Sequence, residues 1–250
     1  MSSPPACSNT FARLAESYDE LRPLDETWVE TVERMVELGD LRGRRVLDVG
    51  CGTGRLAIAL AEGYTAKVWG VDPEPAMLDV ARRKAPHLGW KLGRAEDLPF
   101  RDAWFEGAVL NLVVQHVDRP VAFAEVRRVL ILGRRAVVST PDPRRIGDHW
   151  LSRFFPSYLK IELGRFPPAE TIERELSNAG FAETRVERFE FPRQLSREFA
   201  LQRIRMRSFS TFDLLPADEY ESGLARAERE LPDTVESVSE WLLVAGTASQ

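Results

Sequence analysis

An apolar run that leads directly into three glycines at alternate positions constrains this chain more than any other feature. The run covers 46–49, and the glycines are Gly50, Gly52 and Gly54. It predicts a buried strand that turns sharply into an apolar helix over 56–61. Turns of this kind are where open α/β sheets hold ligands, because the free N–H groups of the helix start face outward.

Each glycine has its own expected reason. Gly50 permits the tight exit from the strand, and Gly52 lets the main chain approach a ligand without a Cβ in the way. Gly54 allows close contact between the helix and the sheet. A glycine-rich turn by itself is also compatible with a simple loop. The next strand therefore decides whether this turn is predicted to bind a ligand.

That next strand is the apolar run 66–71, which ends in Asp72. An acid at this point accepts both ribose hydroxyls of an adenosine, so the pair of strands predicts an adenosine cofactor. The spacing G-x-G-x-G differs from the G-x-G-x-x-G of dinucleotide sites. Asp48, two residues before the first glycine, would repel a diphosphate and suits a ligand with an amine.

The segment 48–54 resembles the first motif of the class I S-adenosylmethionine-dependent methyltransferases, in particular their small-molecule branch (type 11, ubiquinone-biosynthesis-like). The resemblance implies an α/β fold of the Rossmann-like, doubly wound type. Its mostly parallel sheet would have seven strands with an antiparallel last strand, helices on both faces, and helical cap and lid insertions. It also implies S-adenosylmethionine as cofactor. The cofactor contacts expected from this motif and those below are Asp48, Gly50, Cys51, Gly52, Gly54, Asp72, Met77, Ala95, Glu96, Asn111 and Leu112.

Two further segments carry the adenine side of the resemblance. In 72–81, similar to the second motif, Met77 would border the adenine, although a Met there also suits plain core. The segment 93–100 resembles the adenine loop, with Ala95 and Glu96 as contacts. Arg94 stands where the family places a small acidic or amide residue, which leaves Glu96 or its neighbour Asp97 as replacements.

The fourth apolar run, 107–114, resembles the family's fourth strand, with Asn111 and Leu112 under the sulfonium end of the cofactor. The usual Pro-Pro and aromatic do not follow Asn111, which disfavours methylation of base or amide nitrogen. O-, C- and amine N-methylation stay open. Segment 131–134 replaces the family's Pro-Gly-Gly, which predicts a changed turn before the fifth strand.

The expected organisation is one domain with four parts: cap helices over 1–40, the cofactor-binding core over 41–140, a lid or substrate loop over 141–168, and the rest of the sheet over 169–250. A helical insertion near 192–233 would separate the last two strands, expected over 182–190 and 237–247. The aromatic-rich lid is expected to supply core and pocket walls. Arginines in the insertion are read as a solvated face or an anion site; they are Arg193, Arg197, Arg203, Arg205 and Arg207.

No residue is assigned a firm catalytic role. Helical spacing from Phe11 to Tyr18 predicts a cap helix, in which Tyr18 either lies over the active site or anchors the cap. His116 is the best-placed candidate base, since imidazole titrates near working pH, but it also fits a turn-closing role. His87 and His149 lack partners at ligand spacing, so no metal site is predicted.

Composition limits the remaining classes. The 250 residues are 44% apolar, enough for one sizeable core, and the net charge of −5 argues against a nucleic-acid partner. No apolar run reaches the ~18 residues of a membrane span. Segment 1–7 lacks the apolar core of a signal peptide, and two cysteines suggest the reducing cytoplasm. Both a monomer and a homodimer remain open.

The predicted function is methyl transfer from S-adenosylmethionine to a small-molecule acceptor by in-line displacement. Positioning and desolvation would be the enzyme's main tasks, because the leaving group is neutral. The alternative is a non-catalytic regulator that binds the cofactor, or RNA through the arginines. A nicotinamide-dependent dehydrogenase is opposed by the glycine spacing and by Asp48.

Overall fold

A computed structural model describes residues 8–250, so segment 1–7, with Cys7, lies outside the described residues. Seven strands form one sheet. They are β1 (Arg45–Val49), β2 (Lys67–Asp72), β3 (Gly89–Leu92), β4 (Phe105–Asn111), β5 (Leu130–Pro141), β6 (Phe181–Ser196) and β7 (Thr234–Ala248).

The strand order is β3-β2-β1-β4-β5-β7-β6. The neighbours from β3 to β5 pair in parallel, and β7 pairs antiparallel with both β5 and β6. The order reverses between β1 and β4, and doubly wound sheets bind ligands at this point, outside the carboxyl ends of the strands. The predicted α/β sheet with an antiparallel last strand is confirmed.

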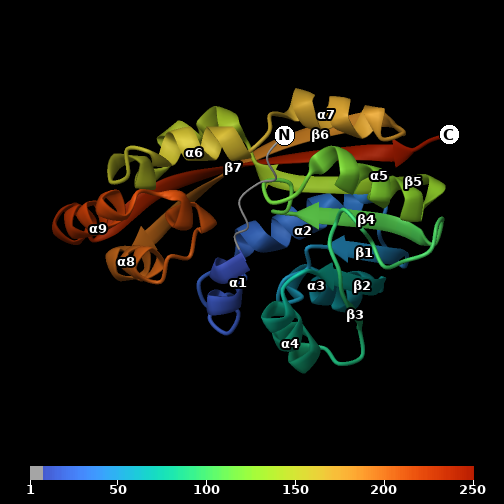
Figure 1. Ribbon diagram of the computed structural model, residues 1–250, viewed down its shortest axis with the longest axis horizontal. Helices are drawn as coiled ribbons and strands as arrows, with labels where there is room; N and C mark the ends of the chain where they lie inside the picture. The colour runs from blue at the N-terminus through green and yellow to red at the C-terminus, as the bar shows by residue number, and fades with distance from the viewer. Residues whose placement is uncertain (1–7) are drawn as a thin grey trace.

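Helices cover both faces of this sheet (Figure 1). The α-helices are α1 (Ser8–Leu14), α2 (Glu26–Gly39), α3 (Arg55–Tyr64), α4 (Pro75–Lys84), α5 (Arg119–Val129), α6 (Tyr158–Arg165), α7 (Ala169–Asn178), α8 (Arg197–Arg205) and α9 (Ala217–Glu230). Three 3-10 helices are η1 (Pro143–Asp148), η2 (Trp150–Arg153) and η3 (Ser210–Leu214). No helix of residues 8–250 is both long and apolar enough to cross a bilayer.

The core of the sheet is divided into two clusters, one on each face. Phe123 of α5 and Ile172 of α7 pack with the strands on one face. Met35 of α2 and Leu60 of α3 pack with them on the other. Strands buried on both faces need apolar residues at nearly every position, which explains the continuous apolar runs that predicted β1 and β4.

Two expectations about connections are wrong. The spacing of Phe11 to Tyr18 predicted one helix, but α1 ends at Leu14 and turns follow. Segment 131–134 is part of β5 rather than a turn, because the strand begins at Leu130. The extra residues are taken up by a shift of register between β4 and β5, with Gly133 at φ +77°.

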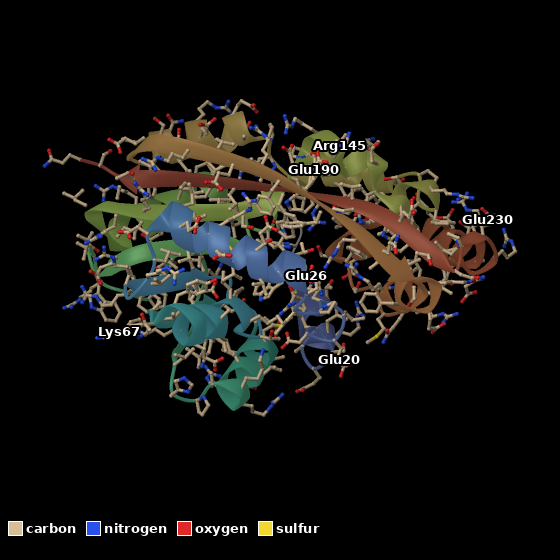
Figure 2. All side chains as sticks on the ribbon, turned by 180° about the vertical axis from the view of Figure 1, so that it is seen from behind. Glu20, Glu26, Lys67, Arg145, Glu190 and Glu230 are labelled. Atoms are coloured by element: carbon tan, nitrogen blue, oxygen red, sulfur yellow. The ribbon has the colours of Figure 1, made fainter. Side chains whose placement is uncertain are left out.

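Strands β6 and β7 are much longer than their sequence patterns suggested. Pairing continues from Phe181↔Ala248 to Ser196↔Thr234, so the antiparallel pair extends well past the sheet and carries α8 and α9 at its end (Figure 1). Arg145 lies 3.2 Å from Glu240 of β7, and Glu240 is paired with Glu190 of β6; Arg145 and Glu190 are labelled in Figure 2.

The lid segment and the insertion share a third apolar cluster on this extension. Phe154 and Phe155 of the lid are buried with Ile204 of α8, Phe212 of η3 and Ala227 of α9. Sequence patterning treated the two segments as separate parts. The structure packs them together as one wall, which stands beyond the carboxyl ends of the strands.

Candidate cofactor and acceptor site

The turn after β1 is held by main-chain contacts to β2. The N–H groups of Gly50 and Cys51 both donate to the Val71 carbonyl, at 2.8 Å and 3.1 Å. Gly50, Gly52 and Gly54 all have positive φ, of 69°, 53° and 79°, a region that L side chains rarely adopt. The backbone therefore reverses within five residues and delivers the chain to the start of α3.

The three glycines differ in their surroundings. A Cβ on Gly50 would lie 2.4 Å from the Val113 side chain, and one on Gly54 would lie 2.6 Å from the Trp90 ring. A Cβ on Gly52 would meet nothing within 4 Å, although Gly52 lines a cavity. Gly50 and Gly54 are thus required by packing, whereas the space above Gly52 is open to a ligand.

Asp72, at the end of β2, is tied to the same turn. Its Oδ2 accepts from the Gly52 N–H at 2.8 Å, and its Oδ1 accepts from the Glu74 N–H at 2.9 Å. Burial raises the pKa of Asp72, and these two N–H groups oppose the rise. Each oxygen keeps a lone pair for a further donor such as a hydroxyl.

Asp48 is the most perturbed acid near the turn. It is 2% exposed, and its Oδ2 has no hydrogen-bond partner among the described residues. Burial, with the charge of Asp72, raises the pKa of Asp48 to about 8. A buried carboxyl of this kind lacks a cation, and an ammonium group would restore its ionised form.

Replacing Asp48 by asparagine is therefore expected to stabilise the protein, more at pH 8 than at pH 5. The folded-state pKa of about 8 lies above the ordinary value of 3.8, so the folded state binds the proton more tightly. Stability is then lost as pH rises from about 4 to 8, and the asparagine removes this loss. Thermal melts should show Asp48→Asn several degrees above the wild type at pH 8.

Asp79→Asn is the matched control, because Asp79 is an exposed acid paired with Arg82 at 2.9 Å. Its melting curve should follow the wild type across this pH range. A wild-type advantage over Asp48→Asn that grows toward pH 8 would contradict the assignment.

One cavity of about 1000 Å³ joins the glycine turn to the wall formed by lid and insertion. Of the residues expected at the site, it is lined by Asp48, Gly50, Cys51, Gly52, Asn111, Leu112, His116 and Tyr18. Gly54, Asp72, Met77, Ala95 and Glu96 do not line it. The structure thus gathers the amine and sulfonium sides of the expected site in the cavity and places the adenine side behind its wall.

The cap covers that adenine side. Phe11, Ala15 and Tyr18 pack against Met77, which is 1% exposed. Glu96 accepts from the Asp118 N–H at 3.0 Å and lies 3.5 Å from Arg94, whose side chain is largely exposed. Arg94 therefore faces solvent rather than the cavity.

Asp19 of the cap contacts the glycine turn, and sequence reasoning did not identify this residue. Its Oδ1 accepts from the Thr53 hydroxyl at 2.6 Å, and its Oδ2 lies 2.6 Å from Lys84 Nζ. Lys84 also donates to the Thr53 carbonyl at 2.9 Å. This network fastens the cap to the glycine turn. In the sequence, Asp19 is marked only by its position directly after Tyr18, the aromatic residue that was considered for the cap.

The tip of β4 carries the two residues that were expected at the sulfonium end, Asn111 and Leu112. Leu112 has a positive φ of 59° and its N–H donates to the Ser139 carbonyl at 2.9 Å. The Asn111 Oδ1 is buried without a partner among the described residues. This strained corner presents two consecutive residues to the cavity, which is the kind of local strain that accumulates at functional sites.

The candidate base His116 is in the cavity, but its protonation differs from expectation. Its ring makes an edge contact with Phe11, with centroids 5.2 Å apart. Burial, with the charge of Arg165, lowers the pKa of His116 to about 3, so titration near working pH is not found. Burial together with Glu190 raises the pKa of Glu240, another cavity residue, to about 7. Arg145, 3.2 Å from Glu240, opposes this rise. The position of Glu240 in an apolar strand did not indicate a perturbed acid.

Comparison with known proteins agrees with this geometry. The family described as "Methyltransferase domain" matches residues 46–133. Demethylmenaquinone methyltransferase of Chlorobaculum tepidum is 32% identical over 200 residues, which cover 69% of this chain and 83% of that protein. 2-Phytyl-1,4-naphtoquinone methyltransferase of Trichormus variabilis is 33% identical over 142 residues, or 51% of this chain and 61% of that protein.

Solved structures share the fold. Phosphoethanolamine N-methyltransferase 2 of Haemonchus contortus, in complex with S-adenosyl-L-methionine, superposes with a TM-score of 0.61 at 20% identity. The match covers 98% of this chain and 58% of that one. The sequence similarity extends over 83% of the length of the demethylmenaquinone methyltransferase. The chain therefore belongs to the class I S-adenosylmethionine-dependent methyltransferases and methylates a small-molecule acceptor.

Proposed function

We propose that this enzyme holds S-adenosylmethionine on the turn after β1 and transfers its methyl group to an acceptor bound in the same cavity. Asp72 accepts the ribose hydroxyls, and Asp48 faces the ammonium group. The observation that carries this proposal is that a single cavity is lined both by Gly52 of the glycine turn and by Arg203 of the insertion.

The residues present fit this cofactor in two respects. The buried Asp48 Oδ2 has no partner among the described residues, as expected for an atom that meets a ligand cation. The open space beside Gly52 admits a ligand against the main chain. Met77, Ala95 and Glu96 are proposed to border the adenine from beneath the cap, with Glu96 in place of the acid that Arg94 replaces.

The protein's own contribution is positioning and exclusion of water. When bound, the cofactor supplies an electrophilic methyl group on sulfur. The corner at Asn111 and Leu112 would orient this end, and the cap network at Asp19 would close over it. His116 is neutral across physiological pH and can accept a hydrogen bond from the acceptor. Glu240 is the stronger base of the two, because its pKa is raised whereas that of His116 is lowered.

Asp72→Ala is expected to weaken binding of S-adenosylhomocysteine by about 1–3 kcal/mol, or about 5- to 150-fold. The variant loses the hydrogen bonds from ribose to a charged acceptor. Isothermal titration calorimetry measures the effect directly. Asp79→Ala is the control, because this acid on α4 is exposed and contacts only Arg82 among the described residues.

Asp79→Ala should bind as the wild type does. Unchanged affinity in Asp72→Ala, with Tm preserved, would refute the ribose assignment. Wild-type protein that binds NAD more tightly than S-adenosylhomocysteine would refute the proposed cofactor site as a whole.

The setting of the enzyme is also a proposal. Few cysteines, with Cys51 buried and unpaired, support a reducing compartment such as the cytoplasm. We further propose that the cap, core, lid and insertion act as one domain, as a monomer or a homodimer, since the cavity is lined by all four parts.

A further inference from the structure

Three arginines from separate segments of the chain line the cavity near the lid and the insertion. Arg22 comes from the cap, Arg193 from β6 and Arg203 from α8. Burial, with the positive charges of Arg22 and Arg193, lowers the pKa of Arg203 to about 9. The guanidinium groups of Arg22 and Arg193 therefore lie close enough to Arg203 to repel it.

The protein does not pair all three of these positive charges with an acid. Arg193 is paired with Asp25. Arg22 donates to the Ser208 carbonyl at 2.7 Å, while its second terminal nitrogen, Nη1, is buried without a partner. Arg203 forms no ion pair within residues 8–250, and its Nε is buried without a hydrogen-bond partner there. Two partly buried cations, each with a buried nitrogen that lacks a partner, thus line the cavity without a paired anion among residues 8–250.

Aromatic rings hold the two uncompensated groups in place. The Arg203 guanidinium lies 4.2 Å from the centroid of Phe209, and that of Arg22 lies 4.0 Å from the centroid of Tyr18. A guanidinium stacked on a ring keeps its N–H groups at its edge, in the fork arrangement that matches a carboxylate. The arginines are therefore oriented before any ligand arrives.

The neighbouring arginines of the insertion behave differently. Arg205 lies 2.9 Å from Glu228, and Arg197 donates to the carbonyl of the same residue. Arg207 stacks over Tyr220 at 3.8 Å. None of these three lines the cavity. Of the five arginines in the sequence cluster, Arg193 and Arg203 thus line the cavity. Of these two, Arg193 is paired with Asp25, and Arg203 has no ion pair among the described residues.

Aromatic side chains line the cavity near Arg203, beside polar ones such as Ser210 and Thr211. Trp150, Tyr158, Phe166 and Phe209 contribute to its wall together with His149. Burial, with the charge of Arg203, lowers the pKa of His149 to about 3, so its ring is neutral. The acids that the lid and β7 bring to the cavity are already paired: Glu162 with Arg165 at 3.3 Å, Asp142 with Arg144 at 2.8 Å, and Glu240 with Arg145 at 3.2 Å. Burying part of a cation without a partner costs folding free energy. This cost points to an anion that is supplied by a ligand.

We propose that the methyl acceptor is an apolar molecule bearing a carboxylate, and that Arg203, assisted by Arg22, binds this carboxylate. This inference rests on the proposed function, because it names the class of acceptor for the same cavity. The anion anchors the acceptor at the insertion, and the apolar body extends toward the sulfonium side at Asn111.

The test uses probes that differ only in charge: 2-naphthoate and its neutral analogue 2-naphthamide, with benzoate and decanoate as further carboxylates. Each is titrated into the full-length protein, with and without saturating S-adenosylhomocysteine, and followed by the fluorescence of the cavity tryptophans. The wild type should bind 2-naphthoate at least about 10-fold more tightly than 2-naphthamide, the scale of one charged hydrogen-bonded contact.

Arg203→Gln should abolish this preference, and Arg205→Gln, on the surface of the same helix, should keep it. Arg22→Gln should reduce it and replaces Arg203→Gln if the latter does not fold, as judged by thermal melting. Equal affinities for the two naphthalenes, a preference that survives in the folded arginine variant, or no millimolar binding of any carboxylate would overturn the inference. Binding of S-adenosylhomocysteine is measured separately by calorimetry. If the protein binds S-adenosylhomocysteine but shows no preference for the carboxylate, this inference alone is refuted.

Discussion

Gly54→Ala is expected to lower the Tm of this enzyme by about 5–15 °C, corresponding to about 2–5 kcal/mol. The alanine Cβ would lie 2.6 Å from Trp90 and 3.1 Å from Ala81. Trp90 cannot move away easily, because its indole N–H donates a hydrogen bond to the Ala85 carbonyl at 2.9 Å. The positive φ of 79° adds backbone strain to this overlap.

Gly133→Ala separates the two causes. Gly133 has a similar φ of 77°, but a Cβ there would meet nothing within 4 Å. It should therefore show the backbone penalty alone, about 1–2 kcal/mol. If thermal melts show equal losses for the two variants, the close approach of α3 to Trp90 is not what requires Gly54.

Gly52→Ala is expected to have the opposite profile, with a small loss of stability and a large loss of cofactor affinity. Its Cβ meets no protein atom within 4 Å, so the fold loses only the backbone penalty. The added methyl group would occupy the space through which the cofactor approaches the main chain. Overpacking of this kind costs about 2–3 kcal/mol, or about 30- to 150-fold in affinity for S-adenosylhomocysteine.

Calorimetry and thermal melting on the same three glycine variants give an internal comparison. Gly133→Ala should bind S-adenosylhomocysteine normally, since Gly133 lies in β5 and outside the cavity. Gly52→Ala protein that keeps wild-type affinity would show that the cofactor does not contact this part of the turn.

The central sheet could be predicted from sequence because its signals are local. A strand buried on both faces must be apolar along its length, and the glycines after β1 mark the turn that follows. The same reasoning overlooked the ends of β6 and β7. Pro192 is a poor strand former, and segment 192–194 lacks an apolar pattern, yet these residues pair with the partner strand β7 beside them.

The site was predictable in part for the same reason. Asp48, Gly52 and Asn111 lie next to strand ends, which sequence patterns locate. Asp19 acts through contacts with Thr53 and Lys84, far from it in the chain. Arg203 differs from Arg205 only in the direction that it faces on α8. Such residues become visible only when elements distant in sequence are brought together.

The most direct test of the account is a crystal structure of the enzyme with S-adenosylhomocysteine and 2-naphthoate. We expect the ribose hydroxyls to hydrogen-bond to Asp72, the amino group to face Asp48, and the sulfur to lie at Asn111 and Leu112, with the carboxylate on Arg203. An adenosine bound away from Asp72, or a cofactor sulfur that does not open on the cavity leading to Arg203, would contradict it.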